Sequence, residues 1–214
     1  MPLTLYFHPL SSFCHKALIA LYENDTPFKP VAVDLSDETS RNAFLAVWPV
    51  GKFPALRDAD RLIPESTSII EYLALHYPGP IKLIPDDAET ALKTREIDRF
   101  YDLSLHIEMQ KIIGDRMRPK DQNDPYGVAH AKGKVETALA LADKDMANNP
   151  WAAGDDFTMA DCAAAPPLFY CDFAIAPLAG HYDNLAAYLG RLKQRPSYAR
   201  ALKEAEPFLG MVPR

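Results

Sequence analysis

The stretch LTLYFHPLSSFCHKALIALYE, residues 3–23, decides how the first part of the chain folds. Leu3 to Phe7 predicts a short β-strand, which His8-Pro9 ends. From Ser11 to Glu23 apolar residues recur at helical spacing, behind two serines that can cap a helix. A strand that leads through a short turn into a helix is the beginning of a parallel β-α-β unit.

Strands and helices continue to alternate up to about residue 78. The pattern predicts further strands at 28–33, 55–58 and 61–63, and further helices at 39–47 and 66–76. The resulting order, β-α-β-α-β-β-α, describes a β-α-β unit followed by an antiparallel hairpin and a covering helix. Tyr77-Pro78-Gly79-Pro80 then breaks the last helix and begins a linker to about residue 87.

From Ala88 onward nearly all of the chain is expected to be helical, with helices at 88–117, 126–146, 158–172, 183–194 and 197–206. Pro166-Pro167 is expected to bend or interrupt the third of these helices. The first has two apolar stripes, which indicates that it is covered on two sides, in a bundle or in a dimer. The expected fold class is therefore α/β plus all-α, with one domain over residues 1–78 and an all-helical bundle domain over residues 88–214.

The composition is that of a folded protein, with 214 residues of which 48% are hydrophobic and 24% charged. The 23 basic and 29 acidic side chains give a net charge of −6, so no nucleic-acid partner is expected. No apolar run reaches the roughly 18 residues of a membrane-spanning helix, and no basic leader is present, so we expect no membrane partner and a cytoplasmic protein. The sequence has no CxxC pair, and its histidines form no metal-ligand motif. We therefore expect neither a disulfide framework nor a metal site.

The first turn of the α/β part can bind an anion, because a helix N-terminus carries free N–H groups and partial positive charge. Oxidoreductases of the thioredoxin-like kind have a CxxC at this place, but here the spacing reads Ser11-Ser12-Phe13-Cys14. A leading serine cannot form a mixed disulfide, yet it can donate a hydrogen bond to the thiolate of a ligand.

Two further turns could bind the rest of a small peptide. If the Phe53–Pro54 bond is cis, the backbone of Phe53 can pair with an extended peptide as an added strand. At the start of the helix at 66–76, Ser66 can hold a carboxylate and Glu65 can accept from an ammonium group. The three turns together describe a receptor for a peptide with a thiol, a carboxylate and an amine.

These features resemble the cytosolic glutathione S-transferases, from the serine-type, theta- and zeta-like side of the family that has many bacterial members. The resemblance covers the whole chain and includes four motifs, namely Ser11-Ser12-Phe13-Cys14, Val50-Gly51-Lys52-Phe53-Pro54-Ala55-Leu56, Glu65-Ser66 and the helix-capping Asp156-Phe157-Thr158-Met159-Ala160-Asp161. It implies a thioredoxin-like domain that binds glutathione, a helical domain with a pocket for a hydrophobic electrophile, a homodimer and a role in detoxification. The implied reaction is transfer of an alkyl or aryl group to the thiol of glutathione.

The resemblance also implies roles for particular residues. Ser11 would donate to the glutathione sulfur, with Ser12 as the next candidate. The rest of glutathione would contact Phe53 and Pro54 at its cysteinyl backbone, Glu65 and Ser66 at its γ-glutamyl end, and Lys52 and Arg41 at its glycyl carboxylate. Asp98 would reach the glutathione of the neighbouring subunit. The residues expected to line the electrophile pocket are His106, Met109, Gln110, Ile113, Met117 and Phe208.

Alternative interpretations remain at this point. Ser11 taken alone is most simply a helix cap, and Cys14 is most simply a small buried residue. His8 and His15 are expected to be exposed polar side chains. The same serine could serve a glutathione-dependent isomerase or dehalogenase, and the fold could belong to a non-catalytic binding or stress-response protein. A redox protein using Cys14 is a third alternative, and the sequence does not identify the acceptor substrate.

Overall fold

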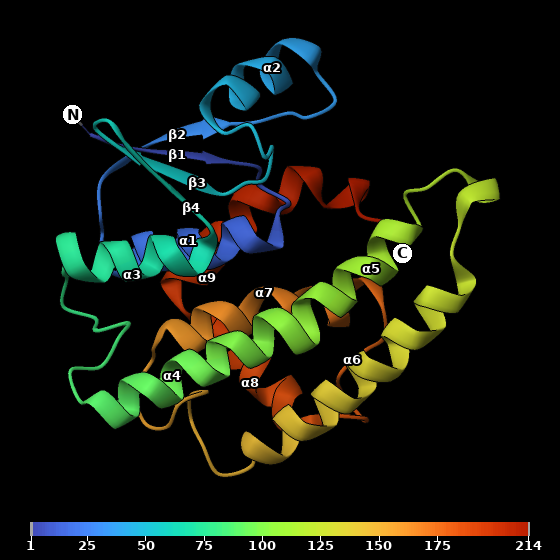
Figure 1. Cartoon of the computed structure of the whole chain (residues 1–214). Helices are drawn as coiled ribbons and strands as arrows, with labels where there is room; N and C mark the ends of the chain where they lie inside the picture. Colours follow the sequence, from blue (N-terminus) through green and yellow to red (C-terminus); the bar gives the residue numbers. More distant parts are fainter. Residues whose placement is uncertain (1, 214) are drawn as a thin grey trace.

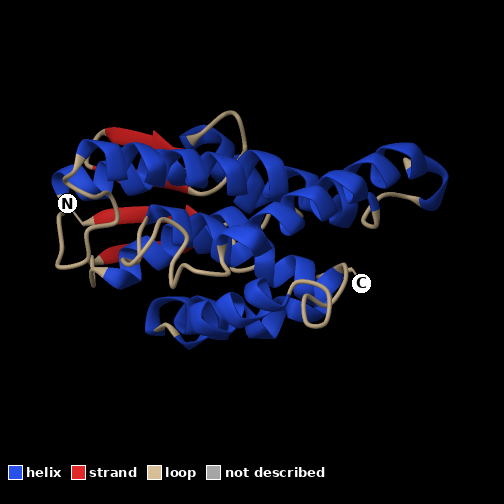
Figure 2. Ribbon diagram, turned by 90° about the horizontal axis from the view of Figure 1, so that it is seen from below, coloured by secondary structure: helices blue, strands red, loops and turns tan. Residues whose placement is uncertain are grey.

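The computed structural model describes residues 2–213, so residues 1 and 214 at the outer ends of the two expected domains lie outside the described residues. An α/β domain with a small sheet packs against a bundle of helices (Figure 1). The strands occupy one half of the molecule, and helices make up most of the remainder (Figure 2). The expected fold class, α/β plus all-α, is confirmed.

The sheet has the strand order β2-β1-β3-β4. β1 runs parallel to β2 and antiparallel to β3, and β3 runs antiparallel to β4. The strands are β1 (Leu3–Phe7), β2 (Phe28–Ala32), β3 (Ala55–Asp58) and β4 (Arg61–Pro64), and the helices of this domain are α1 (Ser12–Glu23), α2 (Glu38–Val47) and α3 (Ser66–His76). Their order is the expected β-α-β-α-β-β-α of a thioredoxin-like domain.

The two faces of the sheet contact different helices, because successive side chains of a strand point to opposite sides. Leu3, Leu5 and Phe7 are buried in the core that α1 and α3 share with the helical domain. Tyr6 points to the other face, where its ring centre lies 5.9 Å from that of Phe44 in α2. Accordingly, α2 lies above the sheet, and α1 and α3 lie between the sheet and the helical domain (Figure 1).

The helical domain begins with one long helical stretch. It consists of α4 (Ala88–Phe100), a π-helical segment η1 (Tyr101–His106) and α5 (Ile107–Asp115), where the sequence predicts one continuous helix. The remaining helices are η2 (Lys120–Gln122), α6 (Pro125–Asp145), α7 (Met159–Ala174), α8 (Asp183–Gln194), α9 (Pro196–Ala205) and η3 (Glu206–Met211). A π-helical segment adds a residue to a turn and often marks a functional site.

Pro166 and Pro167 do not interrupt their helix, contrary to one of the two outcomes expected from the sequence. Both lie inside α7, nearly all of whose side chains are buried. Because proline has no N–H, the carbonyl groups of Cys162 and Ala163 lose their usual helical donors. Packing of the apolar side chains of α7 on every side keeps the helix continuous.

The motif that ends in Asp161 caps α7, as expected. The Thr158 side chain accepts a hydrogen bond from the backbone of the first turn, and the Asp161 carboxylate accepts one from the Thr158 N–H at 2.8 Å. Asp161 also accepts from the Tyr188 hydroxyl at 2.5 Å and from the Ala152 N–H at 2.8 Å. One buried carboxylate therefore joins the start of α7 to α8 and to the preceding loop.

His15 is fully buried in α1, so the expectation of an exposed side chain is wrong. Its position faces α7 and α9, where its ring lies near the rings of Tyr170 and Tyr198. His15 Nε2 lies 2.6 Å from the carbonyl oxygen of Pro9, and a carbonyl can only accept, so Nε2 carries the hydrogen. Burial lowers the pKa of His15 from 6.5 to about 4.

This buried imidazole makes the folded state sensitive to acid. Between pH 6.5 and about 4 the unfolded chain protonates His15 and the folded chain does not, so the free energy of unfolding falls as the pH falls. Relative to His15→Gln, the wild type is expected to lose up to about 3 kcal/mol between pH 7 and pH 4. Urea titrations at several pH values measure this difference, with the exposed His181→Gln as control. Parallel pH profiles for wild type and His15→Gln would contradict the prediction.

Candidate active site

Ser11 caps α1 from the turn that follows β1. Its Oγ accepts a hydrogen bond from the Cys14 N–H at 3.3 Å, and its own N–H donates to the His8 carbonyl at 3.0 Å. Ser11 is therefore a helix cap, as the simplest interpretation of the sequence expects. A hydroxyl oxygen that accepts from a backbone N–H still has its own hydrogen to donate, so capping leaves Ser11 able to bind an anion.

Ser12 is the first residue of α1 and has different partners. Its Oγ lies 2.6 Å from Nε2 of His106 and 3.4 Å from Nε2 of Gln110. The His106 ring is fully buried and stacks on Phe13, with 3.8 Å between the ring centres. Burial, together with the positive charge of Lys16, holds the pKa of His106 well below its ordinary value, so the ring is neutral at pH 7. The two adjacent serines therefore differ, because only Ser12 is joined to the helical domain.

Both serines line a cavity of about 520 Å³ between the two domains. Other lining residues are His8, Leu10, Phe53, Met109, Gln110, Ile113, Gly114, Met117, Tyr170, Met211, Val212 and Pro213. A larger cavity of about 670 Å³ lies between η1, α5 and α6, but neither serine lines it. The cavity at the N-terminus of α1 is therefore the candidate active site.

The structure places four of the six expected pocket residues on this cavity, namely Met109, Gln110, Ile113 and Met117. His106 is not among the lining residues, because its ring is buried behind Ser12 and Phe13. Phe208 is not on the lining either; its ring contacts His8, and residues 211–213 take the place expected for it. Both are corrections to the sequence-based expectation.

The expected glutathione contacts lie at the starts of structural elements. The Phe53–Pro54 bond is cis, Pro54 is buried and Phe53 lines the cavity. Ser66 is buried at the N-terminus of α3, and Glu65 before it is exposed with φ of +68°, a backbone region that residues other than glycine rarely adopt. Lys52 is exposed, and the Arg41 guanidinium donates to the Leu35 carbonyl at 2.9 Å.

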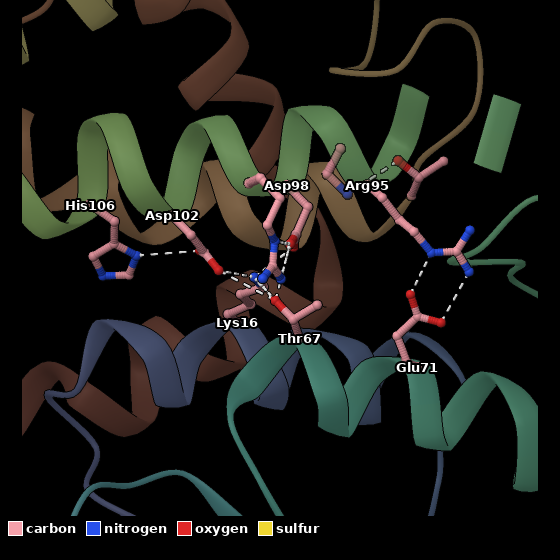
Figure 3. A network of polar contacts seen from close by, with 10 residues as sticks. Lys16, Thr67, Glu71, Arg95, Asp98, Asp102 and His106 are labelled. Carbon is pink, nitrogen blue, oxygen red and sulfur yellow. Dashed lines mark hydrogen bonds and ion pairs between the residues drawn. The ribbon is translucent and has the colours of Figure 1, made fainter. Parts of the chain in front are cut away.

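Asp98 is fully buried, which corrects the expectation that it reaches towards a neighbouring subunit. Its carboxylate forms an ion pair with Lys16 of α1 at 2.6 Å and accepts from the Thr67 hydroxyl of α3 at 3.0 Å. Lys16 also forms an ion pair with Asp102 of η1 at 2.6 Å and donates to Thr67 at 2.7 Å. Figure 3 shows this domain junction, defined here as Lys16, Thr67, Asp98 and Asp102, with the partly exposed Arg95–Glu71 ion pair beside it.

The domain junction is continuous with the candidate site through His106. The Nδ1 atom of His106 lies 3.9 Å from Oδ1 of Asp102, and its Nε2 faces Ser12. Burial raises the pKa of Asp102, and the positive charge of Lys16 opposes this effect. The junction thus fixes α1, which carries both serines, and α3, which begins at Ser66, against the helical domain.

Cys14 is unsuited to redox chemistry. Its side chain is fully buried, and burial raises the pKa of its thiol to about 12. The thiolate is the nucleophilic form, so a thiol with this pKa is inert near neutral pH. The structure therefore gives no support to the alternative of a redox protein that uses Cys14.

Sequence reasoning missed several residues of the cavity. His8 is half-buried on its lining rather than exposed, and Tyr170 of α7 lines it while its hydroxyl donates to the Leu10 carbonyl at 2.7 Å. Residues 211–213 also line it, and the Arg116 guanidinium donates to the Pro213 carbonyl at 3.2 Å. The position of His8 in the turn after β1 could have predicted its place on the cavity. No periodicity in the sequence indicates the same for Tyr170 or for residues 211–213.

Within residues 2–213, no helix is both long and apolar enough to span a membrane. The same residues contain no cluster of three or more His, Cys, Asp or Glu side chains that could hold a metal ion.

The fold and site thus define a class: a thioredoxin-like domain that presents two serines at a helix N-terminus to a cavity shared with a helical domain. Sequence models described as glutathione S-transferase, N-terminal domain, and glutathione S-transferase, C-terminal domain, match residues 5–81 and 125–191. The chain is 34% identical over 130 residues to a glutathione S-transferase-like protein LUC7 of Fusarium, a match that covers 59% of this chain and 58% of that protein. It is 26% identical to glutathione S-transferase GstB of Escherichia coli K12, over 94% of this chain and 97% of that one.

Solved structures agree with these matches. A glutathione S-transferase of Methylobacterium radiotolerans, in complex with glutathione sulfonate, superimposes with a TM-score of 0.81 at 27% identity over 94% of each chain. The chain belongs to the glutathione S-transferase family, and its activity is that of a glutathione transferase. The non-catalytic, isomerase and dehalogenase alternatives are not favoured by these findings.

Proposed function

We propose that Ser11 is the residue that stabilises the glutathione thiolate, which makes this chain a serine-type member of the family. The observation that carries the proposal is the difference between the two serines. With the hydrogen of the neutral His106 ring on Nδ1, on the side of Asp102, Nε2 accepts from the Ser12 hydroxyl at 2.6 Å, whereas Ser11 accepts from a backbone N–H and keeps its hydrogen to donate. Ser12 then contributes as the neighbouring polar group of the same cavity.

The N-terminus of α1 assists Ser11 electrostatically. A thiol with a pKa of roughly 8.5 is mostly protonated at pH 7, and each unit of lowering corresponds to about 1.4 kcal/mol. One hydroxyl donor and the partial positive charge of a helix N-terminus together supply about one to two such units. A lowering of two units brings the pKa of the thiol to about 6.5, which makes the thiolate the main form at pH 7.

We assign the rest of glutathione to the starts of β3 and α3. The cysteinyl backbone would pair with Phe53 beside Pro54, and the N-terminus of α3 at Ser66 would hold the γ-glutamyl carboxylate while Glu65 accepts from its ammonium group. Lys52 and Arg41 are the cations available for the glycyl carboxylate. The glutathione sulfonate bound by the similar Methylobacterium protein supports glutathione as the co-substrate here.

The acceptor is proposed to be a hydrophobic electrophile, because apolar side chains from both domains line most of the cavity. On this assignment residues 1–78 form the glutathione-binding domain, and residues 88–214 form the domain that supplies most of the acceptor pocket. Cys14, Cys162 and Cys171 are free and buried, which fits a reducing compartment such as the cytoplasm, where a detoxifying transferase would act.

We further propose a homodimer that uses the face of η1 and α6. The cavity of about 670 Å³ on this face is lined by Phe100, Leu103, Ala138 and Leu141, among others. Leu103 of η1 is 56% exposed and Leu141 of α6 is 51% exposed, so these apolar side chains have no full cover within the described residues. A second copy of the chain is the occupant that the resemblance implies.

Replacement of Ser11 tests the proposed activation. Ser11→Ala removes the hydroxyl donor and leaves the helix N-terminus, so the pKa of the bound glutathione thiol should rise by about one unit and kcat/KM at pH 7 should fall about 10-fold. Thiolate absorbance of the bound ligand measures the first quantity directly. Ser11→Gly should behave alike with a smaller loss of helix capping, and Ser12→Ala is the matched control. Normal ionisation in both Ser11 variants, with its loss in Ser12→Ala, would transfer the role to Ser12.

Replacement of Leu103 tests the proposed dimer. Sedimentation equilibrium should give twice the chain mass of 23.9 kDa for the wild type and the monomer mass for Leu103→Glu, because a charge is then buried at the interface. His181→Glu, on the loop before α8, should stay dimeric. A monomeric wild type, or a Leu103→Glu variant that remains dimeric, would contradict this interface.

A further inference from the structure

The ring of His8 has a defined hydrogen-bonding state. His8 lies in the turn between β1 and α1, and its Nδ1 accepts a hydrogen bond from the Leu10 N–H at 3.1 Å. Because a backbone N–H can only donate, Nδ1 must carry the lone pair, and in the neutral ring the hydrogen is on Nε2. Burial lowers the pKa of His8, and the negative charge of Asp34 opposes only part of this effect, so the ring is neutral at pH 7.

The ring is also held in place beside the thiolate site. It stacks on Phe53 with 6.1 Å between ring centres and contacts Phe208 edge-on at 5.9 Å. The His8 carbonyl accepts from the Ser11 N–H at 3.0 Å, so the imidazole and the proposed thiolate donor belong to one tight turn. Both line the same cavity, and within residues 2–213 no hydrogen-bond acceptor is found for His8 Nε2.

A hydrogen-bond donor at this position can bind the electrophilic substrate. Gln110 of the helical domain also lines the cavity, and its amide already donates to Ser12 at 3.4 Å. The Tyr170 hydroxyl is engaged by the Leu10 carbonyl. His8 Nε2 therefore remains as a neutral donor at the glutathione end of an otherwise mainly apolar cavity.

We propose that His8 is a catalytic residue that donates from Nε2 to a carbonyl oxygen of the electrophile, so that the enzyme favours acceptors whose C=C bond is conjugated with a carbonyl group. The inference rests on the proposed attack by a Ser11-stabilised thiolate. It assigns the chemical class of the acceptor and adds a residue that acts on the acceptor rather than on glutathione.

The chemistry balances without any further reactant. The thiolate sulfur forms a bond to the β-carbon, the electron pair of the C=C bond shifts towards the carbonyl, and negative charge develops on the oxygen. No group leaves, and the proton released when the thiol ionised returns to the α-carbon from solvent. The hydrogen bond from His8 strengthens as the oxygen becomes an enolate, so it stabilises the transition state more than the bound substrate.

Displacement of a halide is the comparison reaction, because His8 has no part in it. In that reaction the negative charge develops on the departing halide, and an alkyl halide without oxygen offers His8 no acceptor. The two substrate classes share glutathione binding, thiol ionisation and the same cavity. The ratio of their rates therefore isolates the contribution of His8.

The test compares trans-4-phenyl-3-buten-2-one, a conjugated enone, with benzyl chloride for the wild type and three variants of the full chain. His8→Asn keeps an acceptor for the Leu10 N–H, as in an Asx-turn, but has no donor at the distance of Nε2. His8→Gln places an amide donor near that distance. His181→Asn is the surface control.

His8→Asn is expected to lower kcat/KM for the enone about 10- to 100-fold more than for benzyl chloride, with the KM for glutathione unchanged. His8→Gln should recover part of the loss. Equal losses for both substrates, or none for the enone, would overturn the inference, as would a wild type that conjugates benzyl chloride but not the enone. A wild type that conjugates neither substrate would overturn the proposed function itself.

Discussion

The buried ion pairs of Lys16 are the interaction on which the arrangement of the two domains depends. A lysine with no exposed surface is tolerated only when its charge is fully paired, and here Asp98 and Asp102 supply two carboxylates while Thr67 accepts a hydrogen bond. The Arg99 guanidinium lies 2.7 Å from Asp98, so the two acidic groups are matched by two basic groups. Removal of one partner from such a pair leaves a buried charge uncompensated, at a cost of about 3–5 kcal/mol.

This junction sets the geometry of the candidate active site, because the helices that it joins carry the residues of that site. Asp98, Asp102 and His106 follow one another at intervals of four residues, so they lie along one face of the stretch that passes from α4 through η1. That face meets α1 at Lys16 and at Ser12, and it meets the start of α3 at Thr67. The helix N-termini that we propose to bind the thiol and the γ-glutamyl carboxylate are thus attached to the same helical stretch, which continues to the candidate cavity at Met109 and Ile113.

Much of the fold could be predicted from the sequence because its local signals are strong. The strand at Leu3–Phe7 and the helix at Ser66–His76 have the predicted bounds, since proline, serine and apolar periodicity mark both their ends. The cavity-lining positions of Ser11, Phe53 and Met109 followed from motif spacing and helical faces. These are cases in which the information lies within a few residues of the position concerned.

The remaining features depend on contacts between distant parts of the chain. Nothing near Lys16 in the sequence distinguishes it from a surface lysine, and its partners Asp98 and Asp102 lie more than 80 residues away. The same holds for Asp98, which the resemblance placed at a neighbouring subunit, for His106, which was expected to line the pocket, and for His15, which was expected to be exposed because it is polar. Residues 211–213 also line the cavity, where the Pro213 carbonyl accepts from Arg116, another contact that no local pattern contains.

The most direct test of this account is the free energy of unfolding of Lys16→Met in urea, compared with that of Lys93→Met, which removes an exposed lysine of α4. If the buried ion pairs hold the domains together, Lys16→Met should be less stable than the wild type by about 3–5 kcal/mol, whereas Lys93→Met should differ from it by about 0.5 kcal/mol or less. Equal stability of the two variants would contradict the central role given to Lys16.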